Sequence, residues 1–162
     1  MGLRDVRIDE TTWRQASEAR RREWRAAIEE LLEPGRAVFR PEADRIEVDV
    51  SEQAIALRLL DGDGATLEEV RIPRDALATL VTEYVDIVRQ IAKDDASGGL
   101  ARLEALDMAK KVVHDRAAQM LLASCEGFGM DHATARRLFT LLLGLRVDTT
   151  RLVGVHGHRR VR

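Results

Sequence analysis

The period of the hydrophobic pattern changes once along this chain, and that change limits the folds open to it. Between residues 44 and 60 apolar side chains alternate with polar ones, in DRIEVDV and again in AIALRLL. This two-residue period is typical of half-buried strands. After Pro73 the period becomes helical and stays so to about residue 146. A chain that places strands first and helices afterwards favours an α+β fold, in which helices pack on one sheet.

The N-terminal half is expected to supply a small antiparallel sheet of three to four strands. Residues 44–50, 54–60 and 65–72 have strand patterns, and the links between them, SEQ and DGDG, are rich in turn-forming residues. Residues 3–9 alternate less regularly and add a fourth strand. Strands this close in sequence usually pair antiparallel, because short turns are enough to join them.

About four helices are predicted, one early and three in the C-terminal half. The early helix begins after Ser17, a favourable N-cap residue, and ends at Pro34 and Gly35. The other three span about 74–93, 100–124 and the segment that follows the N-cap residue Asp131. We expect one α+β domain over residues 1–147 and a basic, flexible tail over residues 148–162.

The overall composition argues against several classes of function. The 162 residues include 26 Lys and Arg against 28 Asp and Glu, a formal net charge of -2 that disfavours general attraction to nucleic acid or to an anionic membrane. No window approaches the roughly 20 apolar residues of a membrane-spanning helix. The single cysteine, Cys125, excludes an intrachain disulfide and is expected to pack inertly. We therefore expect a cytoplasmic protein, and no cofactor or metal is predicted, the two tail histidines His156 and His158 being too few ligands.

One polar strip stands out on the long helix predicted at 100–124. Asp107, Lys110, Lys111 and His114 are three, four or seven residues apart, so they share one side of the helix. Lys110 lies almost within the apolar stripe, where a lysine is costly to bury unless it is paired or faces a cleft. The strip is either a structural network of charges or a site for an anionic group or an acidic partner.

Two adjacent arginines in the last helix, Arg136 and Arg137, are the second candidate feature. They fall on opposite flanks of the apolar stripe formed by Ala135, Leu138 and Leu142. Their stems can cover apolar surface while the guanidinium groups stay in water. Only one of them can join Lys110 and Lys111 in a basic groove between the two helices.

Two segments, ALDMAKKVVH at 105–114 and ATARRLFTLL at 133–142, resemble an uncharacterised family of small alphaproteobacterial proteins, uncharacterised protein family 0262. The resemblance extends over about residues 3–146, and TARRLFTL is its most specific stretch. It implies a bacterial cytosolic protein of one small domain and implies no activity. The chain departs from the family pattern at Asp115 and Arg116, where an amide followed by an acid is expected.

Three functions are compatible with these observations. The main hypothesis is a non-enzymatic binding or regulatory module that uses the basic inter-helix groove for a small anionic ligand or a protein partner. The alternative is a small enzyme with His114 as general acid or base, its pKa set by Asp107 and the two lysines. A third is an RNA- or DNA-associated protein that uses RRREWR at 20–25 and the basic tail. Neither the partner nor the oligomeric state follows from the sequence.

Overall fold

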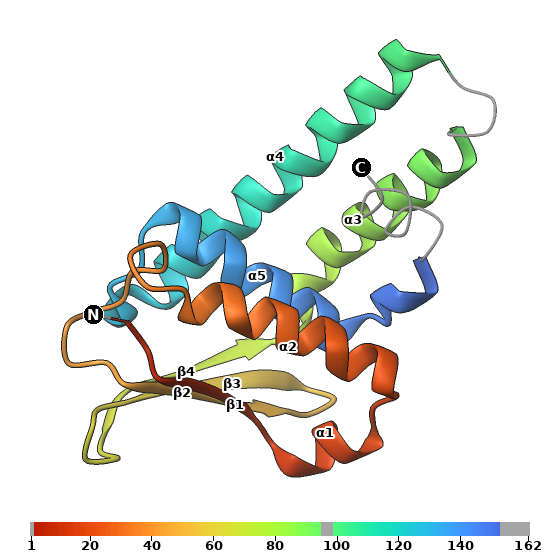
Figure 1. Cartoon of the computed structure of the whole chain (residues 1–162). Coiled ribbons are helices and arrows are strands. Elements are labelled where there is room, and N and C mark those ends of the chain that lie inside the picture. Colours follow the sequence, from red (N-terminus) through yellow and green to blue (C-terminus); the bar gives the residue numbers. More distant parts are fainter. Residues whose placement is uncertain (1, 95–98, 153–162) are drawn as a thin grey trace.

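The computed structural model describes residues 2–94 and 99–152 and has one four-stranded sheet with helices packed on one face (Figure 1). The predicted α+β class is therefore confirmed. The elements in chain order are β1 (Asp5–Ile8), α1 (Glu10–Gln15), α2 (Glu18–Leu32), β2 (Arg45–Val50), β3 (Ala54–Leu60), β4 (Thr66–Pro73), α3 (Arg74–Asp94), α4 (Leu100–Ser124), η1 (Glu126–Phe128), α5 (His132–Arg146) and η2 (Thr149–Leu152).

The strands are arranged in the order β1-β2-β3-β4. β2, β3 and β4 form the expected antiparallel meander, with Val48 opposite Leu57 and Leu57 opposite Val70. β1 differs from the expectation because it pairs with β2 in parallel, with Val6 opposite Ile46. The reason is the connection: α1 and α2 lie between these two strands and return the chain to the same end of the sheet, as a parallel crossover requires.

Local turn and cap chemistry fixes the ends of several elements. Ser17 accepts a hydrogen bond from the Arg20 amide at 3.2 Å, and Asp131 accepts one from the Thr134 amide at 2.8 Å. Both residues are therefore the N-caps that the sequence predicted. The DGDG link is a hairpin turn, in which the Asp61 carboxylate accepts hydrogen bonds from the amides of Asp63 and Ala65, each at 2.9 Å.

Helix α5 lies at the centre of the helical layer, against α2 on one side and α4 on the other (Figure 1). Nine of its 15 residues are buried. The Trp24 indole of α2 donates to the Gly144 carbonyl at 2.9 Å, and a Cβ at Gly144 would lie 3.3 Å from the Trp24 ring. Thr134 is buried but accepts a hydrogen bond from the Val38 amide at 2.8 Å. The core is thus built around α5, and the Gly144 carbonyl and the Thr134 hydroxyl buried within it are both paired.

Helices α3 and α4 form a hairpin that extends away from the sheet (Figure 1). The C-terminal part of α4 carries the buried residues of that helix, Val113, Ala117, Ala118 and Leu121. Its N-terminal part exposes three apolar residues, Leu100, Met108 and Val112, which are 72%, 59% and 51% exposed. The outer half of the hairpin therefore presents apolar surface away from the core.

The predicted tail begins with a short helical turn, η2, at Thr149–Leu152. Residues 153–162, which include His156 and His158, lie outside the described residues.

We predict that Gly129 is more sensitive to substitution than Gly35, although both have a positive φ, 71° and 78°. A Cβ at Gly129 would lie 2.8 Å from the backbone nitrogen of Arg40, whereas one at Gly35 meets nothing within 4 Å. Gly35→Ala should lower the free energy of unfolding by about 1–2 kcal/mol through backbone strain alone. Gly129→Ala adds a steric clash and should cost about 2–4 kcal/mol. Urea unfolding of both variants measures this, and equal losses would contradict the close approach.

Candidate functional site

The polar strip lies on one unbroken helix, because α4 continues from Leu100 to Ser124 as predicted. Its four residues nevertheless have different surroundings. Asp107 and Lys111 are exposed, whereas Lys110 and His114 are partly buried. Helical spacing predicted that these side chains share one side of α4, and the neighbouring helices decide which of them face solvent.

His114 is packed between two aromatic rings. Its ring centroid lies 5.4 Å from that of Tyr84 in α3 and 5.2 Å from that of Phe139 in α5, both in edge-to-face contact. Burial, followed by the positive charges of Arg136 and Lys110, lowers the pKa of His114 from 6.5 to about 4, and Asp115 opposes the shift. The imidazole is therefore neutral near pH 7 and serves as a packing group between three helices.

Lys110 is accommodated beside the apolar stripe by an aromatic ring. Its ammonium nitrogen lies 5.8 Å from the centroid of Tyr84. The aliphatic stem of a lysine covers apolar surface while a ring face attracts its charge, so partial burial is tolerated here. Lys111, one residue later, is exposed to solvent. The two lysines thus differ in their freedom to meet a partner.

Arg136 and Arg137 contact different helices, in agreement with their predicted positions on opposite flanks of α5. Arg136 forms an ion pair with Asp115 of α4. Arg137 donates to the carbonyl of Glu30 at 2.9 Å and lies 3.7 Å from the Glu33 carboxylate, at the end of α2. Only Arg136 therefore lies beside the strip on α4.

Asp115 organises this junction, a role that the sequence did not reveal. Besides pairing with Arg136, it lies 3.1 Å from the Nε2 atom of His132. The hydrogen bond with His132 and the charge of Arg136 lower the pKa of Asp115. Asp115 and His132 belong to different helices, so their contact depends on how η1 turns the chain between α4 and α5, and no local pattern encodes it.

Met108 and Val112 are exposed apolar residues that the sequence analysis did not single out. They are four residues apart on α4, on the side opposite Leu103, Val113 and Ala117, and both are more than half exposed. The sequence feature that could have identified them is their position on the side of the helix opposite its buried apolar stripe. Large apolar side chains that share an exposed helical face are typical of surfaces that another molecule covers.

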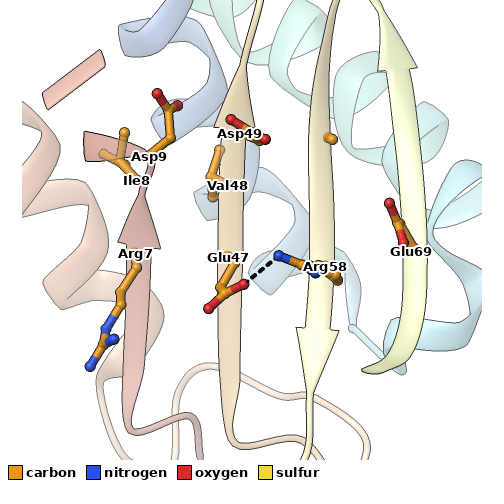
Figure 2. A pocket seen from close by; sticks show the side chains of 9 residues that line it. Arg7, Ile8, Asp9, Glu47, Val48, Asp49, Arg58 and Glu69 are labelled. Atoms are coloured by element: carbon orange, nitrogen blue, oxygen red, sulfur yellow. Dashed lines mark hydrogen bonds and ion pairs between the residues drawn. The ribbon is translucent and has the colours of Figure 1, made fainter. Parts of the chain in front are cut away.

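The open face of the sheet carries a hollow of about 420 Å³ lined mainly by charged side chains (Figure 2). The strand register places Arg7, Glu47, Arg58 and Glu69 in one row across all four strands. Arg58 and Glu47 are joined by a 2.7 Å ion pair. Opposite charges alternate along the row and neutralise one another. This arrangement suits a solvated sheet surface better than a charged ligand.

Several site types find no support in the described residues. Within residues 2–94 and 99–152 no group of three or more His, Cys, Asp or Glu side chains is placed to hold a metal ion. No helix of this part of the chain is both long and apolar enough to cross a bilayer. Cys125 is buried, and burial raises the pKa of its thiol to about 11, so it is a packing residue and not a nucleophile.

The basic segment RRREWR lies on α2, where its aromatic ring is not available to nucleic-acid bases. Trp24 is only 2% exposed, and the Arg20 guanidinium lies 5.1 Å from its ring centroid. Arg25 lies over Trp13 at a similar 5.1 Å. Single-stranded nucleic acid is usually held by exposed aromatic rings beside cations. Arg20 and Arg25 of α2 instead contact the protein's own tryptophan rings.

Comparison with known proteins gives a family match over nearly the whole chain. The profile of the uncharacterised protein family UPF0262 matches residues 2–148. A UPF0262 protein of Novosphingobium aromaticivorans is 33% identical over 158 residues, covering 88% of this chain and 94% of that protein. The corresponding protein of Maricaulis maris is 34% identical and covers 76% and 79%. No solved structure matches this chain.

We predict that His114 makes the stability of the protein decline in mild acid. Because its pKa in the folded state is lowered from 6.5 to about 4, the unfolded chain binds a proton in this interval that the folded chain does not. The free energy of unfolding should therefore fall as the pH is lowered from about 6.5 towards 4. His114→Phe, an apolar ring for the same site, should flatten this decline in urea unfolding measured across pH.

His132→Gln is the matched control, because it removes an exposed imidazole and leaves His114 in place. It should retain the decline. An NMR titration of wild-type His114 with a midpoint near 6.5 would show that the ring is not desolvated as described.

Proposed function

This chain belongs to the uncharacterised protein family UPF0262, and we propose that it is a non-enzymatic binding module that holds an acidic protein partner on helix α4. The observation that carries the proposal is the outward side of α4. There Met108 and Val112 expose apolar side chains on either side of Lys111 in the sequence, on a hairpin that extends from the body (Figure 1).

The apolar part of the surface supports protein binding in particular. Met108 and Val112 are separated by one helical turn, so their side chains are neighbours on the same side of α4. Methionine is flexible and polarisable and is enriched in protein interfaces. A small hydrophilic anion gains nothing by contact with Met108 and Val112, whereas a protein segment with apolar side chains can bury them. These residues therefore favour a protein over a free anion.

The positive charge beside Met108 and Val112 favours an acidic partner. Lys111 is exposed next to Met108 and Val112, whereas Lys110 lies over the Tyr84 ring of α3 and Arg136 is paired with Asp115. Asp107 lies one turn before Lys111, a spacing at which opposite charges order one another. Lysines at the rim of an apolar surface increase the rate of association and exclude partners of like charge. Carboxylates flanking apolar side chains on the partner complement this pattern.

The environment of His114 favours a binding role over acid–base catalysis. A general acid or base works best with a pKa near the operating pH, whereas that of His114 is lowered to about 4. Its ring packs against Tyr84 and Phe139 in edge-to-face contact. In this proposal His114 is a neutral spacer that sets the distance between α3, α4 and α5, and Arg137, bound to α2, takes no part.

The test uses a photo-crosslinking amino acid placed at Val112 of the full chain in native host cells, with Arg22 on α2 as the control position. The crosslinked partner is then purified, and its affinity is measured for three variants. Lys111→Glu and Val112→Glu should each weaken binding at least tenfold, and added salt should weaken the wild-type complex. Arg22→Glu makes the same charge reversal at an exposed site on α2 and should change the affinity less than twofold.

All three positions are exposed, and circular dichroism checks that the variants are folded. Unchanged affinity in Lys111→Glu and Val112→Glu would refute the α4 surface. If ultracentrifugation shows a homodimer that Val112→Glu dissociates, and position 112 crosslinks only to a second copy, then the face is self-associating and the acidic partner is wrong.

A further inference from the structure

A hollow of about 660 Å³ lies at the opposite end of α5 from the α4 junction, where α1, α2, α5 and the link between β2 and β3 meet. Its volume falls within the range of small-molecule sites. Three arginines from three separate elements line it, Arg20 of α2, Arg74 of α3 and Arg146 of α5. Side chains of like charge repel one another, so three neighbouring arginines need groups that stabilise their positive charges.

Arg146 has an unpaired hydrogen-bonding edge. Its Nη1 atom donates to the Ser51 carbonyl at 2.7 Å, but its Nε and Nη2 atoms are buried and have no hydrogen-bond partner. Buried polar groups are nearly always paired in folded proteins. Nε–H and Nη2–H point in the same direction from one edge of a guanidinium, and together they match the two oxygens of a carboxylate. The geometry of Arg146 is thus that of a bidentate anion donor.

The other two arginines bring further guanidinium groups to this site. Arg20 donates to the Gly144 carbonyl at 2.8 Å, and its buried Nε atom is also unpaired. Arg74 contacts the Glu52 carbonyl at 3.5 Å. These bonds end on backbone carbonyl oxygens, which orient the guanidinium groups without neutralising their charge. Burial and, after it, the charge of Arg74 lower the pKa of Arg146, as expected for like charges held close together.

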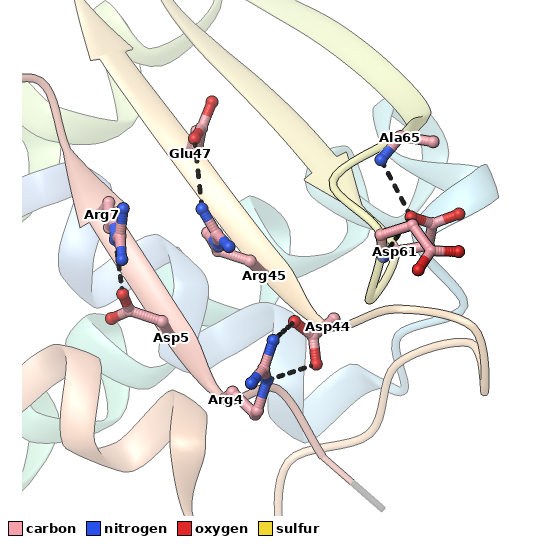
Figure 3. Close-up of polar contacts among 9 residues, drawn as sticks. Arg4, Asp5, Arg7, Asp44, Arg45, Glu47, Asp61 and Ala65 are labelled. Carbon is pink, nitrogen blue, oxygen red and sulfur yellow. Dashed lines mark hydrogen bonds and ion pairs between the residues drawn. The ribbon is translucent and has the colours of Figure 1, made fainter.

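Another arginine of this protein, Arg4, uses the same edge of its guanidinium group to bind a carboxylate. Arg4 donates through Nε and Nη2 to the two oxygens of Asp44, at 2.8 and 2.7 Å (Figure 3). These are the two donors that are unpaired in Arg146. We propose that this hollow binds a small-molecule carboxylate, held in bidentate fashion by Arg146 with Arg20 and Arg74 beside it.

The acidic residues of the hollow narrow the ligand class to a singly charged group. Asp9, Asp49 and Glu52 also line it, so the three positive charges are offset by three negative ones. The Asp9 carboxylate is already engaged, because it accepts hydrogen bonds from Thr12 and from the Val50 amide. A phosphate dianion is repelled more strongly by these groups than a carboxylate. The hollow therefore suits a monocarboxylate, and this site is independent of the α4 surface.

The experiment titrates the full chain with acetate, pyruvate and benzoate, and with inorganic phosphate at matched ionic strength, by calorimetry and thermal unfolding. At least one carboxylate should bind and raise the Tm, because a ligand that binds only the folded state stabilises it. Arg146→Gln should weaken that binding at least tenfold. Arg89→Gln, an exposed arginine of α3 that does not line the hollow, should leave the affinity within twofold.

Arg146→Lys and Arg74→Gln keep the test informative if Arg146→Gln does not fold. Lysine retains the charge but loses the bidentate edge, so it too should weaken carboxylate binding, and loss of the exposed Arg74 should weaken it less. The proposal is overturned if no carboxylate of the panel raises the Tm, if the Arg146 variants bind like Arg89→Gln, or if phosphate binds more tightly than every carboxylate.

Discussion

The burial of α5 is the constraint on which the rest of the structure depends. A helix with nine of 15 residues buried has to be covered on several sides, and burial of a polar group in its core is costly unless that group is hydrogen-bonded. α2 supplies the Trp24 indole for the Gly144 carbonyl, and the segment after α2 supplies the Val38 amide for Thr134. These contacts fix α2 and α5 together over the sheet. The parallel placement of β1 follows, because α2 returns the chain to β2 from this position.

Helix α4 is longer than α5, and its outer part is therefore not covered by α5. The part of α4 that contains Val113, Ala117 and Leu121 is buried in the core, whereas the part before Val113 extends beyond α5 with α3 (Figure 1). Apolar residues on the side of that outer part that faces away from the core, such as Met108, are exposed. The other end of α5 brings Arg146 to the hollow beside Ser51. The two proposed sites thus lie on different helices, one on the exposed side of α4 and the other at the C-terminal end of α5.

Sequence reasoning predicted the features that depend on neighbouring residues. The change from strand to helix period, the caps at Ser17 and Asp131, and the turn at DGDG are local, and the structure confirms them. The direction of β1 is not local, since it depends on how α1 and α2 pack before β2 begins. An extra pair of helices in the connection permits a parallel strand that closeness in sequence alone disfavours.

The candidate site divides in the same way. Helical spacing correctly placed the strip residues on one side of α4 and separated Arg136 from Arg137. It gave no information on the rings that enclose His114, because Tyr84 and Phe139 belong to α3 and α5. The hydrogen bonding of Arg146 could not be predicted from the sequence either, because its partner Ser51 belongs to the link between β2 and β3. Spacing fixes the direction in which a side chain leaves its helix, and tertiary packing decides what it meets.

Hydrogen exchange of backbone amides tests the central claim. Within the described residues, α5 is the buried hub, and the outer part of the α3–α4 hairpin is supported mainly by the packing of its two helices on each other. Amides of Leu138–Leu142 should exchange only through global unfolding, with the highest protection in the chain. Amides of α4 before Val113 should exchange through local opening at lower free energy, while those around Ala117 match α5. Uniform protection along α4, or faster exchange in α5 than in the outer part of α4, would contradict this account.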